Sequence, residues 1–433
     1  QPQLARYSIC AGTPRLKQGT PQMWTPAVGK ILPFLNNLLS QQKSGENSLP
    51  THLPFTGGWL GWLGYDLAWE IEQLPRLKAD PLPFPEAFWY EPATFAVLDH
   101  LQQTLWLAAT CEAELDQLQQ RLEKLSPPSW QLLKTKDLPP FPTFLTSQSH
   151  YQSAVAQAKK YIQEGDIFQA NLSLRFQTLT STDSWLIYQN LRQINPSPFA
   201  SYWQTPWGSV ISCSPERLVQ LQGQQAQTRP IAGTRKRGAT EAIDQQLEQE
   251  LISDLKERAE HIMLVDLERN DLGRVCQWGS VKVNEFMTIE RYSHVMHLVS
   301  NVEGILDAHY NAVDLIRALF PGGTITGCPK VRCLEIIEEL EPVRRSLFYG
   351  SCGYLDQRGN LDLNILIRTL LVTNLGAGLS IEEDAFSPTN SALKLVSGQV
   401  GAGIVAESEP EREWYESLQK AQAQLAALDV GIL

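Results

Sequence analysis

The segment Leu255–Gly273 constrains the fold of this chain most, because its residue pattern fits one long helix with two chemically different faces. Glu257, Glu260 and His261 are spaced i, i+3 and i+4, so a helix places them on one face. A second face carries the apolar stripe that we expect to be buried, which comprises Leu251, Leu255, Ala259 and Ile262. Two neighbouring carboxylates repel each other unless a cation or a proton lies between them, and Mg2+ is the usual cation. A solvated acidic face is the simpler interpretation of this segment taken alone.

Composition places the chain among ordinary globular proteins. Its 433 residues are 43% apolar and 19% charged, which suits one large domain or two. The net charge of −11 argues against nucleic acid or an anionic membrane as the main partner. We find no signal peptide and no apolar run long enough to cross a bilayer. The seven cysteines are widely spread without C-x-x-C spacing, which predicts a reduced, cytoplasmic setting and argues against a zinc site.

The order of the predicted elements favours an α+β chain with large antiparallel sheets and packed helices, because strands and helices do not alternate regularly. We divide the chain into an N-terminal α+β subdomain (1–126), a proline-rich connection (127–145) and a catalytic core (146–433) that is integrated with the N-terminal part.

Local signals predict several individual elements. The glycines of Gly57–Asp66 indicate a strand against which another backbone packs closely. One helix is expected over Glu112–Leu125, and a second runs from an N-cap at Ser149 to a stop at Gly165. Strands are expected at Ala170–Phe176, Gly208–Cys213 and Leu361–Val372.

The C-terminal part carries a second group of polar residues. Ser408–Glu411 has the pattern of a capping box that opens a final helix. The buried face of this helix is predicted to comprise Trp414, Leu418, Ala421 and Leu425. Glu416 and Lys420 form an i, i+4 pair, for which a surface ion pair worth ~0.3–0.5 kcal/mol is the simplest interpretation. Upstream, Ser397–Val405 reads as a glycine-rich turn whose N–H groups could hold a carboxylate, although a purely structural turn fits equally well.

Several ordered segments give the chain a family resemblance. They are Asp166–Leu172, Asn195–Phe199, Ser214–Arg217, Arg229–Thr234, Ser293–His297, Phe320–Lys330, Ile367–Thr369 and Gly401–Val405, together with the acidic helix. With them the chain resembles the chorismate-utilising enzymes, specifically anthranilate synthase component I and aminodeoxychorismate synthase component I. The resemblance implies one large α+β chorismate-binding domain, with two facing antiparallel sheets and the active site in the cleft between them.

The resemblance also implies roles for individual residues. Glu260 and Glu416 would bind Mg2+ directly with Glu257 nearby, and the ion would bind the ring carboxylate of chorismate. Glu216 would act as general acid on the departing C4 hydroxyl, and His297 would lie near the substrate. The other implied contacts with the substrate are Thr234 and Gly233 at the ring, and Arg368, Lys420, Gly401, Ala402 and Gly403 at the enolpyruvyl carboxylate. His294 is expected to be a packing histidine.

Two positions bear on the reaction. The resemblance places Gln169 at the position where family members that add water to chorismate carry a lysine as general base. Glutamine cannot accept that proton, so the chain is predicted to use ammonia instead of water. Ala232 stands where aminodeoxychorismate synthases typically carry a nucleophilic lysine, which favours amination at C2 and anthranilate as the product. Several segments and the short N-terminal region instead look more like the aminodeoxychorismate branch, and we find no Leu-Leu-Glu-Ser segment for inhibitory tryptophan. Phe348 replaces a usual tyrosine, for which Tyr349 is a possible substitute.

The remaining motifs exclude other activities or imply a partner. Phe320–Lys330 lacks the ending of a P-loop, and Cys352 has no His-x-Glu partner of the kind that glutamine amidotransferases use. The chain is therefore expected to depend on a separate glutaminase subunit for ammonia. A catalytically inactive member that only binds a metabolite is the alternative to an enzyme.

Overall fold

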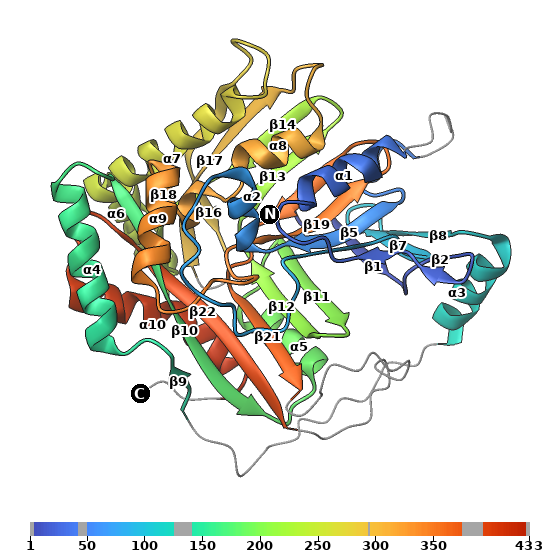
Figure 1. Cartoon of the computed structure of the whole chain (residues 1–433), viewed down its shortest axis with the longest axis horizontal. Coiled ribbons are helices and arrows are strands. Elements are labelled where there is room, and N and C mark those ends of the chain that lie inside the picture. The colour runs from blue at the N-terminus through green and yellow to red at the C-terminus, as the bar shows by residue number, and fades with distance from the viewer. Residues whose placement is uncertain (1–3, 42–49, 125–140, 293–294, 375–392, 430–433) are drawn as a thin grey trace.

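Two large antiparallel sheets form the body of the molecule in the computed structural model, which describes residues 4–41, 50–124, 141–292, 295–374 and 393–429 (Figure 1). The larger sheet contains, in spatial order, β15 (Ile231–Lys236), β17 (Val295–Ile305), β14 (Gln225–Arg229), β13 (Arg217–Gln222), β20 (Leu361–Asn364), β19 (Ser351–Asp356), β5 (Gly58–Leu63), β6 (Ala87–Tyr90) and β4 (Met23–Trp24), and β16 (Lys282–Arg291) pairs with β17. The smaller sheet contains β11 (Phe199–Thr205), β12 (Gly208–Ser214), β21 (Thr369–Asn374), β22 (Lys394–Ile404), β10 (Gln169–Thr180) and β18 (Gly327–Cys328), and β9 (Thr143–Phe144) pairs with β10.

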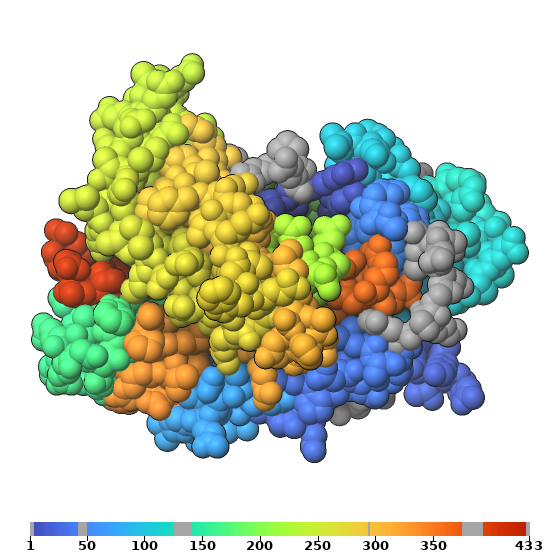
Figure 2. All heavy atoms as spheres, turned by 90° about the horizontal axis from the view of Figure 1, so that it is seen from above, coloured from blue at the N-terminus to red at the C-terminus, as the bar shows by residue number. Residues whose placement is uncertain are grey.

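Helices cover the outer sides of these sheets. On the larger sheet lie α6 (Glu241–Ser253), α7 (Leu255–Gly273) and α8 (Ala312–Leu319), and on the smaller sheet lie α4 (Gln148–Gln163), α5 (Ser184–Ile194) and α10 (Pro410–Ala426). The other helical elements are α1 (Ile31–Ser40), η1 (Tyr65–Leu67), α2 (Ala68–Ile71), α3 (Glu112–Lys124), η2 (Gly323–Ile325) and α9 (Lys330–Leu340). A small sheet of β1 (Tyr7–Ala11), β7 (Thr94–Asp99) and β8 (Thr104–Ala109) lies at the opposite end of the molecule from α10 (Figure 2), and β2 (Leu16–Lys17) pairs with β3 (Thr20–Pro21).

The main hydrophobic core lies between the two sheets. Val210 and Leu371 of the smaller sheet belong to the same buried cluster as Val219 and Trp62 of the larger one. The ring centroids of Trp62 and Trp203 are 6.1 Å apart across this interface. The predicted α+β domain with facing antiparallel sheets is therefore confirmed. No helix in the described segments is both long and apolar enough to span a membrane.

The N-terminal part and the core share one sheet. Strand β5 pairs with β19 from Gly58 to Leu63, so residues separated by almost 300 positions lie side by side. The proline-rich connection lies mostly outside the described residues, and β9 is formed near its end. The domain boundaries drawn from the sequence stay a prediction.

The long strand predicted over Leu361–Val372 is wrong. The segment forms β20 in the larger sheet and β21 in the smaller one, and Ile365–Arg368 crosses between them. Arg368 adopts a positive φ of 52° at the end of this crossover, which breaks the extended conformation. An apolar run of this kind is buried in either sheet, so hydrophobicity alone does not reveal the change of sheet.

Three predictions of helix caps and faces also need correction. Helix α4 is capped by Ser147, whose side chain accepts from His150 N, and Ser149 lies inside the helix. The predicted capping box at Ser408 is wrong, since Glu409 precedes α10 without a side-chain cap and Ser408 Oγ accepts from Val405 N at 3.1 Å. The predicted apolar stripe is right only for Leu251, which is buried but belongs to α6, and is wrong for α7 itself. Leu255 and Ile262 are 83% and 49% exposed, and the helix instead buries a face that contains His261, Leu264, Val265, Glu268, Asp271 and Leu272.

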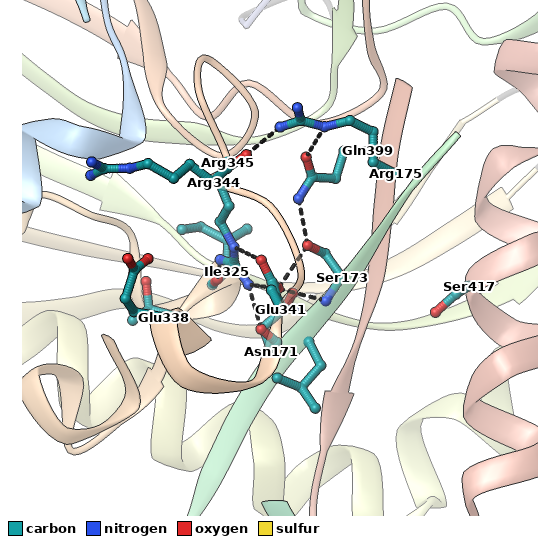
Figure 3. A network of polar contacts seen from close by, with 12 residues as sticks. Asn171, Ser173, Arg175, Ile325, Glu338, Glu341, Arg344, Arg345, Gln399 and Ser417 are labelled. Atoms are coloured by element: carbon teal, nitrogen blue, oxygen red, sulfur yellow. Dashed lines mark hydrogen bonds and ion pairs between the residues drawn. The ribbon is translucent and has the colours of Figure 1, made fainter. Parts of the chain in front are cut away.

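A buried ion pair joins the smaller sheet to the segment after α9 (Figure 3). Arg345 Nη2 donates to Glu341 Oε1 at 2.6 Å and to Asn171 O at 2.6 Å, and Arg345 Nη1 donates to Ile325 O at 2.7 Å. Ser173 N donates to the same carboxylate at 2.8 Å. Because each charge has several partners, the pair fixes η2 against β10.

Gly61 lies where β5 and β6 approach each other most closely, which confirms the close packing predicted for Gly57–Asp66. A Cβ atom at Gly61 would lie 2.0 Å from Phe88 O. We expect Gly61→Ala to lower the free energy of unfolding by about 1–3 kcal/mol, because the strands must separate to accept a methyl group. Gly273→Ala is the matched control: a Cβ atom there meets nothing within 4 Å, so the change should stabilise α7 by up to about 1 kcal/mol. Urea unfolding of both variants measures this, and equal effects would contradict the packing argument.

Candidate active site

Two short crossovers between the sheets meet at one point. The first leads from β12 to β13 and contains Glu216, and the second leads from β20 to β21 and ends at Arg368. Ile365 N donates to Glu216 O at 3.1 Å, and Cys213 N donates to Arg368 O at 3.1 Å. Ser214 Oγ also donates to Ile365 O at 2.6 Å. The two hydrogen-bonded crossovers, hereafter the joint, therefore hold both the proposed general acid Glu216 and the proposed carboxylate-binding Arg368.

Glu260 and Gln169 meet at the end of β10. Gln169 Nε2 donates to Glu260 Oε1 at 2.8 Å, and both side chains lie beside Gly403 of β22. A Cβ atom at Gly403 would lie 2.5 Å from Gln169 Nε2 and 3.2 Å from Glu260 Oε1, so only glycine leaves room for this pair. Burial raises the pKa of Glu260, and the hydrogen bond from Gln169 opposes that shift.

Glu257 lies one helical turn before Glu260 on α7, where Asp254 caps the helix by accepting from Lys256 N and Glu257 N. Arg235 Nη1 lies 3.1 Å from Glu257 Oε1, so this carboxylate already has a cationic partner. Gly233 occupies a bulge of β15 with φ of 66°, and a Cβ atom there would lie 3.0 Å from Glu257 Oε2. Thus Gly233 lies against Glu257, as a residue lining the site would.

His261 does not join the two carboxylates. It is completely buried, and its Nε2 lies 2.6 Å from Ser300 Oγ of β17. Burial lowers the pKa of His261 to about 4, so the ring is neutral and anchors α7 to the sheet.

Helix α10 brings Glu416 and Lys420 to the same region. Lys420 Nζ lies 2.9 Å from Glu416 Oε1 and donates to Gly401 O at 3.0 Å, and Arg368 Nη1 donates to Lys420 O at 2.6 Å. The charge of Lys420 opposes the rise that burial causes in the pKa of Glu260, which places α7 and α10 within electrostatic reach of each other. The pair thus lies in the same region as Glu260 and Arg368, and its role in the site stays a prediction.

The glycine-rich turn predicted over Ser397–Val405 is wrong, because Gly401, Ala402 and Gly403 lie inside β22. Strand β10 pairs with β22 as far as Ile404, whereas the pairing of β21 with β22 ends at Gly398. The part of β22 beyond Gly398 therefore has a strand on one side and turns its other edge towards Lys420 and Arg368. Glycine is needed at position 401 for strand packing, since a Cβ atom would lie 2.4 Å from Leu172 O.

The acid–base groups are Glu216, in the crossover that leads into the larger sheet, and His297 of β17 in that sheet. Glu216 is 5% exposed, and burial raises the pKa of its carboxyl to about 8, with the carboxyl of Glu268 acting in the same direction. His297 Nδ1 lies 3.0 Å from Thr234 Oγ1, and burial together with Arg368 lowers the pKa of His297 to about 4. At neutral pH the arrangement therefore provides a protonated carboxyl group and a neutral imidazole.

Three further positions were named from the sequence. Ala232 is buried in β15 opposite Leu298, and its methyl group offers no nucleophile. Phe348 packs under the guanidinium of Arg175 at 5.4 Å, whereas Tyr349 lies within electrostatic reach of Arg368. Tyr349 is thus the better placed of the two to contact a ligand. His294 lies outside the described residues.

Sequence reasoning missed three residues, of which Glu413 and Glu268 are buried and Tyr292 is half-buried. Glu413 lies one turn before Glu416 on α10, and the i, i+3 spacing could have revealed it. The ring centroid of Tyr292 lies 5.4 Å from that of His297, and its hydroxyl donates to Glu290 Oε2 at 2.8 Å. Glu268 is 5% exposed on α7, and nothing in the local sequence distinguishes it from a solvated acid.

The donor set suits a divalent cation held by few protein ligands. Glu260 is partly buried and accepts a hydrogen bond from the side-chain amide of Gln169. In the described ranges, no group of three or more His, Cys, Asp or Glu side chains is arranged to hold a metal. Mg2+ commonly binds through one or two carboxylates and completes its shell with water and substrate oxygens. Glu260 and Glu416 fit that pattern. Glu257 is already paired with Arg235, so we expect it to lie near the ion without binding it directly.

Comparison with known proteins identifies the class. The family model for chorismate binding enzymes matches residues 19–426, so the chain belongs to the chorismate-binding enzyme family. It is 59% identical to the anthranilate synthase component I-like protein of Synechocystis over 99% of this chain and 84% of that protein. It is 45% identical to aminodeoxychorismate synthase component 1 of Bacillus subtilis over 87% of this chain and 78% of that protein. The crystal structure of anthranilate synthase component I from Streptococcus pneumoniae superposes with a TM-score of 0.79 and 32% identity, covering 97% of this chain and 92% of that one.

We expect Mg2+ to raise the thermal unfolding midpoint of the protein, because a ligand that binds only the folded state stabilises it. At a hundredfold excess over Kd the gain is about 2.7 kcal/mol. Glu260→Gln should keep the fold, since it replaces a buried carboxyl by a neutral group of the same shape, but should lose the Mg2+ effect. Glu250→Gln on the exposed side of α6 is the control and should respond like the wild type. A full Mg2+ response in Glu260→Gln would remove Glu260 from the metal site.

Proposed function

We propose that the chain is the large subunit of a Mg2+-dependent enzyme that aminates chorismate. The observation that carries this proposal is the side-chain amide of Gln169. By the family resemblance this position would hold the general base that activates water, and an amide cannot act as that base. Its Nε2 is engaged by Glu260, and its Oε1 is buried without a hydrogen-bond partner among the described residues. A buried free acceptor suits an N–H of ammonia, which is a nucleophile without help from a base.

The residues of the chain supply the remaining steps. Arg368, Lys420 and the free edge of β22 would bind the enolpyruvyl carboxylate, since a guanidinium and adjacent N–H groups match a carboxylate. Glu216 would protonate the C4 hydroxyl, which leaves as water while ammonia forms a bond to the ring. When bound, Mg2+ would neutralise the ring carboxylate between Glu260 and Glu416. Neutral His297, held by Thr234, would accept a proton when the ring becomes aromatic.

Ala232 favours anthranilate as the product. A methyl group cannot form a covalent bond with C2, so ammonia is free to attack there, and loss of pyruvate then gives the aromatic ring. The protein would act in tryptophan biosynthesis in that case. A separate glutaminase subunit would supply ammonia, as the word component in the names of the relatives suggests. All seven cysteines are free, which is consistent with the cytoplasm.

A second candidate, aminodeoxychorismate synthase, is favoured by one comparison of identities, whereas the relative with 59% identity is named anthranilate synthase component I-like. The chain is 45% identical to the Bacillus subtilis aminodeoxychorismate synthase and 41% identical to the anthranilate synthase component 1 of Synechocystis. In this reaction the amine is added at C4 without loss of pyruvate, and the product leads to 4-aminobenzoate and folate.

Product analysis distinguishes the two candidates. We expect purified protein with chorismate, Mg2+ and ammonium to release anthranilate and pyruvate in equal amounts, measured by chromatography. Formation of 4-aminobenzoate only after addition of aminodeoxychorismate lyase would place the amine at C4 and replace the first candidate by the second. Unchanged chorismate under both conditions would contradict an aminating enzyme and support a binding protein.

A further inference from the structure

His297 lies on β17 between two cross-strand neighbours. In the register of the larger sheet it stands opposite Thr234 of β15 on one side and opposite Glu290 of β16 on the other. Residues directly opposite each other in antiparallel strands turn their side chains to the same face of the sheet. The imidazole is therefore flanked by a hydroxyl group on one strand and by a carboxyl group on the other.

The contacts with β15 fix one nitrogen of the imidazole. His297 Nδ1 lies 3.0 Å from Thr234 Oγ1 and 3.4 Å from Gly233 O. A carbonyl oxygen can only accept a hydrogen bond, so Nδ1 carries the proton of the neutral ring and Nε2 keeps its lone pair. The proposed reaction needs this tautomer, because the nitrogen that accepts a proton must itself be unprotonated.

Tyr292 packs against the imidazole from the end of β16. The ring centroids of Tyr292 and His297 are 5.4 Å apart, and the two ring planes are inclined at 67°. Edge-to-face contacts of this kind are a preferred arrangement of aromatic rings. The hydroxyl of Tyr292 donates to Glu290 Oε2 at 2.8 Å, so the tyrosine ring is tied to the residue that stands opposite His297.

The anchor of Tyr292 is itself firmly held. Glu290 is 2% exposed, and Arg229 Nε donates to its other oxygen, Oε1, at 2.8 Å. Arg229 Nη2 also donates to Glu285 Oε2 at 2.6 Å. The backbone of Tyr292 is fixed as well, because Arg237 Nη1 donates to Tyr292 O at 2.7 Å. The tyrosine ring cannot turn away from His297 without leaving a buried carboxylate oxygen unpaired, which is costly.

We infer that Tyr292 is a positioning residue that fixes the imidazole of His297 for proton transfer. The last torsion of a histidine side chain has two broad minima, so an imidazole can turn over unless its neighbours prevent it. Such a turn would move Nδ1 away from β15 and would displace Nε2 at the same time. The packed ring of Tyr292 prevents the turn. This inference rests on the proposed function, in which His297 accepts a proton.

A double-mutant cycle on chorismate amination tests whether Tyr292 acts through His297. Tyr292→Leu should lower kcat by about 10- to 100-fold, because a small misplacement of a catalytic group is enough for such a loss. KM for chorismate should stay within about twofold of wild type, since the change affects the reaction and not the binding of substrate. In the His297→Asn background, Tyr292→Leu should change kcat by less than about twofold, because residues that act as a unit are not additive.

Two further variants complete the kinetic test. Tyr292→Phe keeps the packed ring but loses the bond to Glu290, so its loss of kcat should lie between those of the wild type and Tyr292→Leu. Tyr310→Leu is the control, because Tyr310 is 44% exposed, and it should retain the wild-type kcat. A full repeat of the loss in the His297→Asn background would overturn the inference, as would an equal loss in Tyr310→Leu.

Nitrogen-15 NMR spectra of histidine-labelled protein give a readout without turnover, because they show which ring nitrogen carries the proton. The signals of His297 are identified by their absence from His297→Asn. We expect the Nδ1–H tautomer alone in the wild type at neutral pH and a mixture of both tautomers in Tyr292→Leu. The Nε2–H tautomer in the wild type would overturn the inference, and so would an unchanged single tautomer in folded Tyr292→Leu.

The two readouts separate this inference from the proposed function. If the wild type does not aminate chorismate, the proposed function fails, and the NMR spectra still decide whether Tyr292 fixes the imidazole. If Tyr292→Leu does not fold, Tyr292→Phe takes its place. A partial mixture of tautomers in Tyr292→Phe would then support the inference, whereas the wild-type tautomer together with the wild-type kcat would overturn it.

Discussion

The site depends on the place where the chain crosses twice between the two sheets. Pro215 and Glu216 lead out of β12, and Ile365–Arg368 lead back into β21, with backbone hydrogen bonds joining the two crossovers. Backbone that leaves a sheet must find new partners for its N–H and C=O groups, and here each crossover satisfies the other. The side chains of Glu216 and Arg368 consequently have fixed positions relative to both sheets, although each belongs to an irregular segment.

Around this joint the two sheets contribute different chemistry. The smaller sheet, with α10, supplies Gln169, the edge of β22 and Lys420, which are groups that bind charge or orient a small molecule. The larger sheet supplies Thr234 and His297, and Glu216 leads into this sheet; burial sets the protonation states of Glu216 and His297. The Arg345–Glu341 ion pair keeps η2 against β10 between them. Breaking such a pair leaves a buried charge without a partner, so the ion pair maintains alignment even where it adds little net stability.

Much of this arrangement follows from the sequence, because ordered motifs indicated the family and the facing sheets and named the residues of the candidate site, whose roles stay a prediction. Local patterns also placed β10, β12, α3 and the close packing at Gly61 within a few residues. The failures have a common physical origin. The apolar run Leu361–Val372 was predicted as one strand, but a buried run fits either sheet, and the segment divides between the two. The glycines of Ser397–Val405 predicted a turn, but glycines also occur in strands, and this segment belongs to β22.

Charges on α7 were the hardest to place. Leu255 and Ile262 look like a buried stripe, but the helix buries His261, Glu268 and Asp271 because the sheet and α9 supply polar partners for most of them. Tyr292 became visible only when its segment was brought against His297, whereas the spacing of Glu413 from Glu416 on α10 was already present in the sequence. Hydrophobic periodicity predicts the buried face of a helix only when that face is apolar, so the prediction fails for α7, whose buried face is partly polar.

The hydrogen bond between Gln169 and Glu260 limits how the specificity of this protein can evolve. A lysine in place of Gln169 would gain a base for water, but its ammonium group would also meet the carboxylate proposed to bind Mg2+, in a space where Gly403 allows no additional atom. A single substitution would therefore change the choice of nucleophile and the affinity for the metal together. Descendants of this chain that exchange ammonia for water must pass through compensating changes near Gly403, which separates the two chemistries by more than one mutational step.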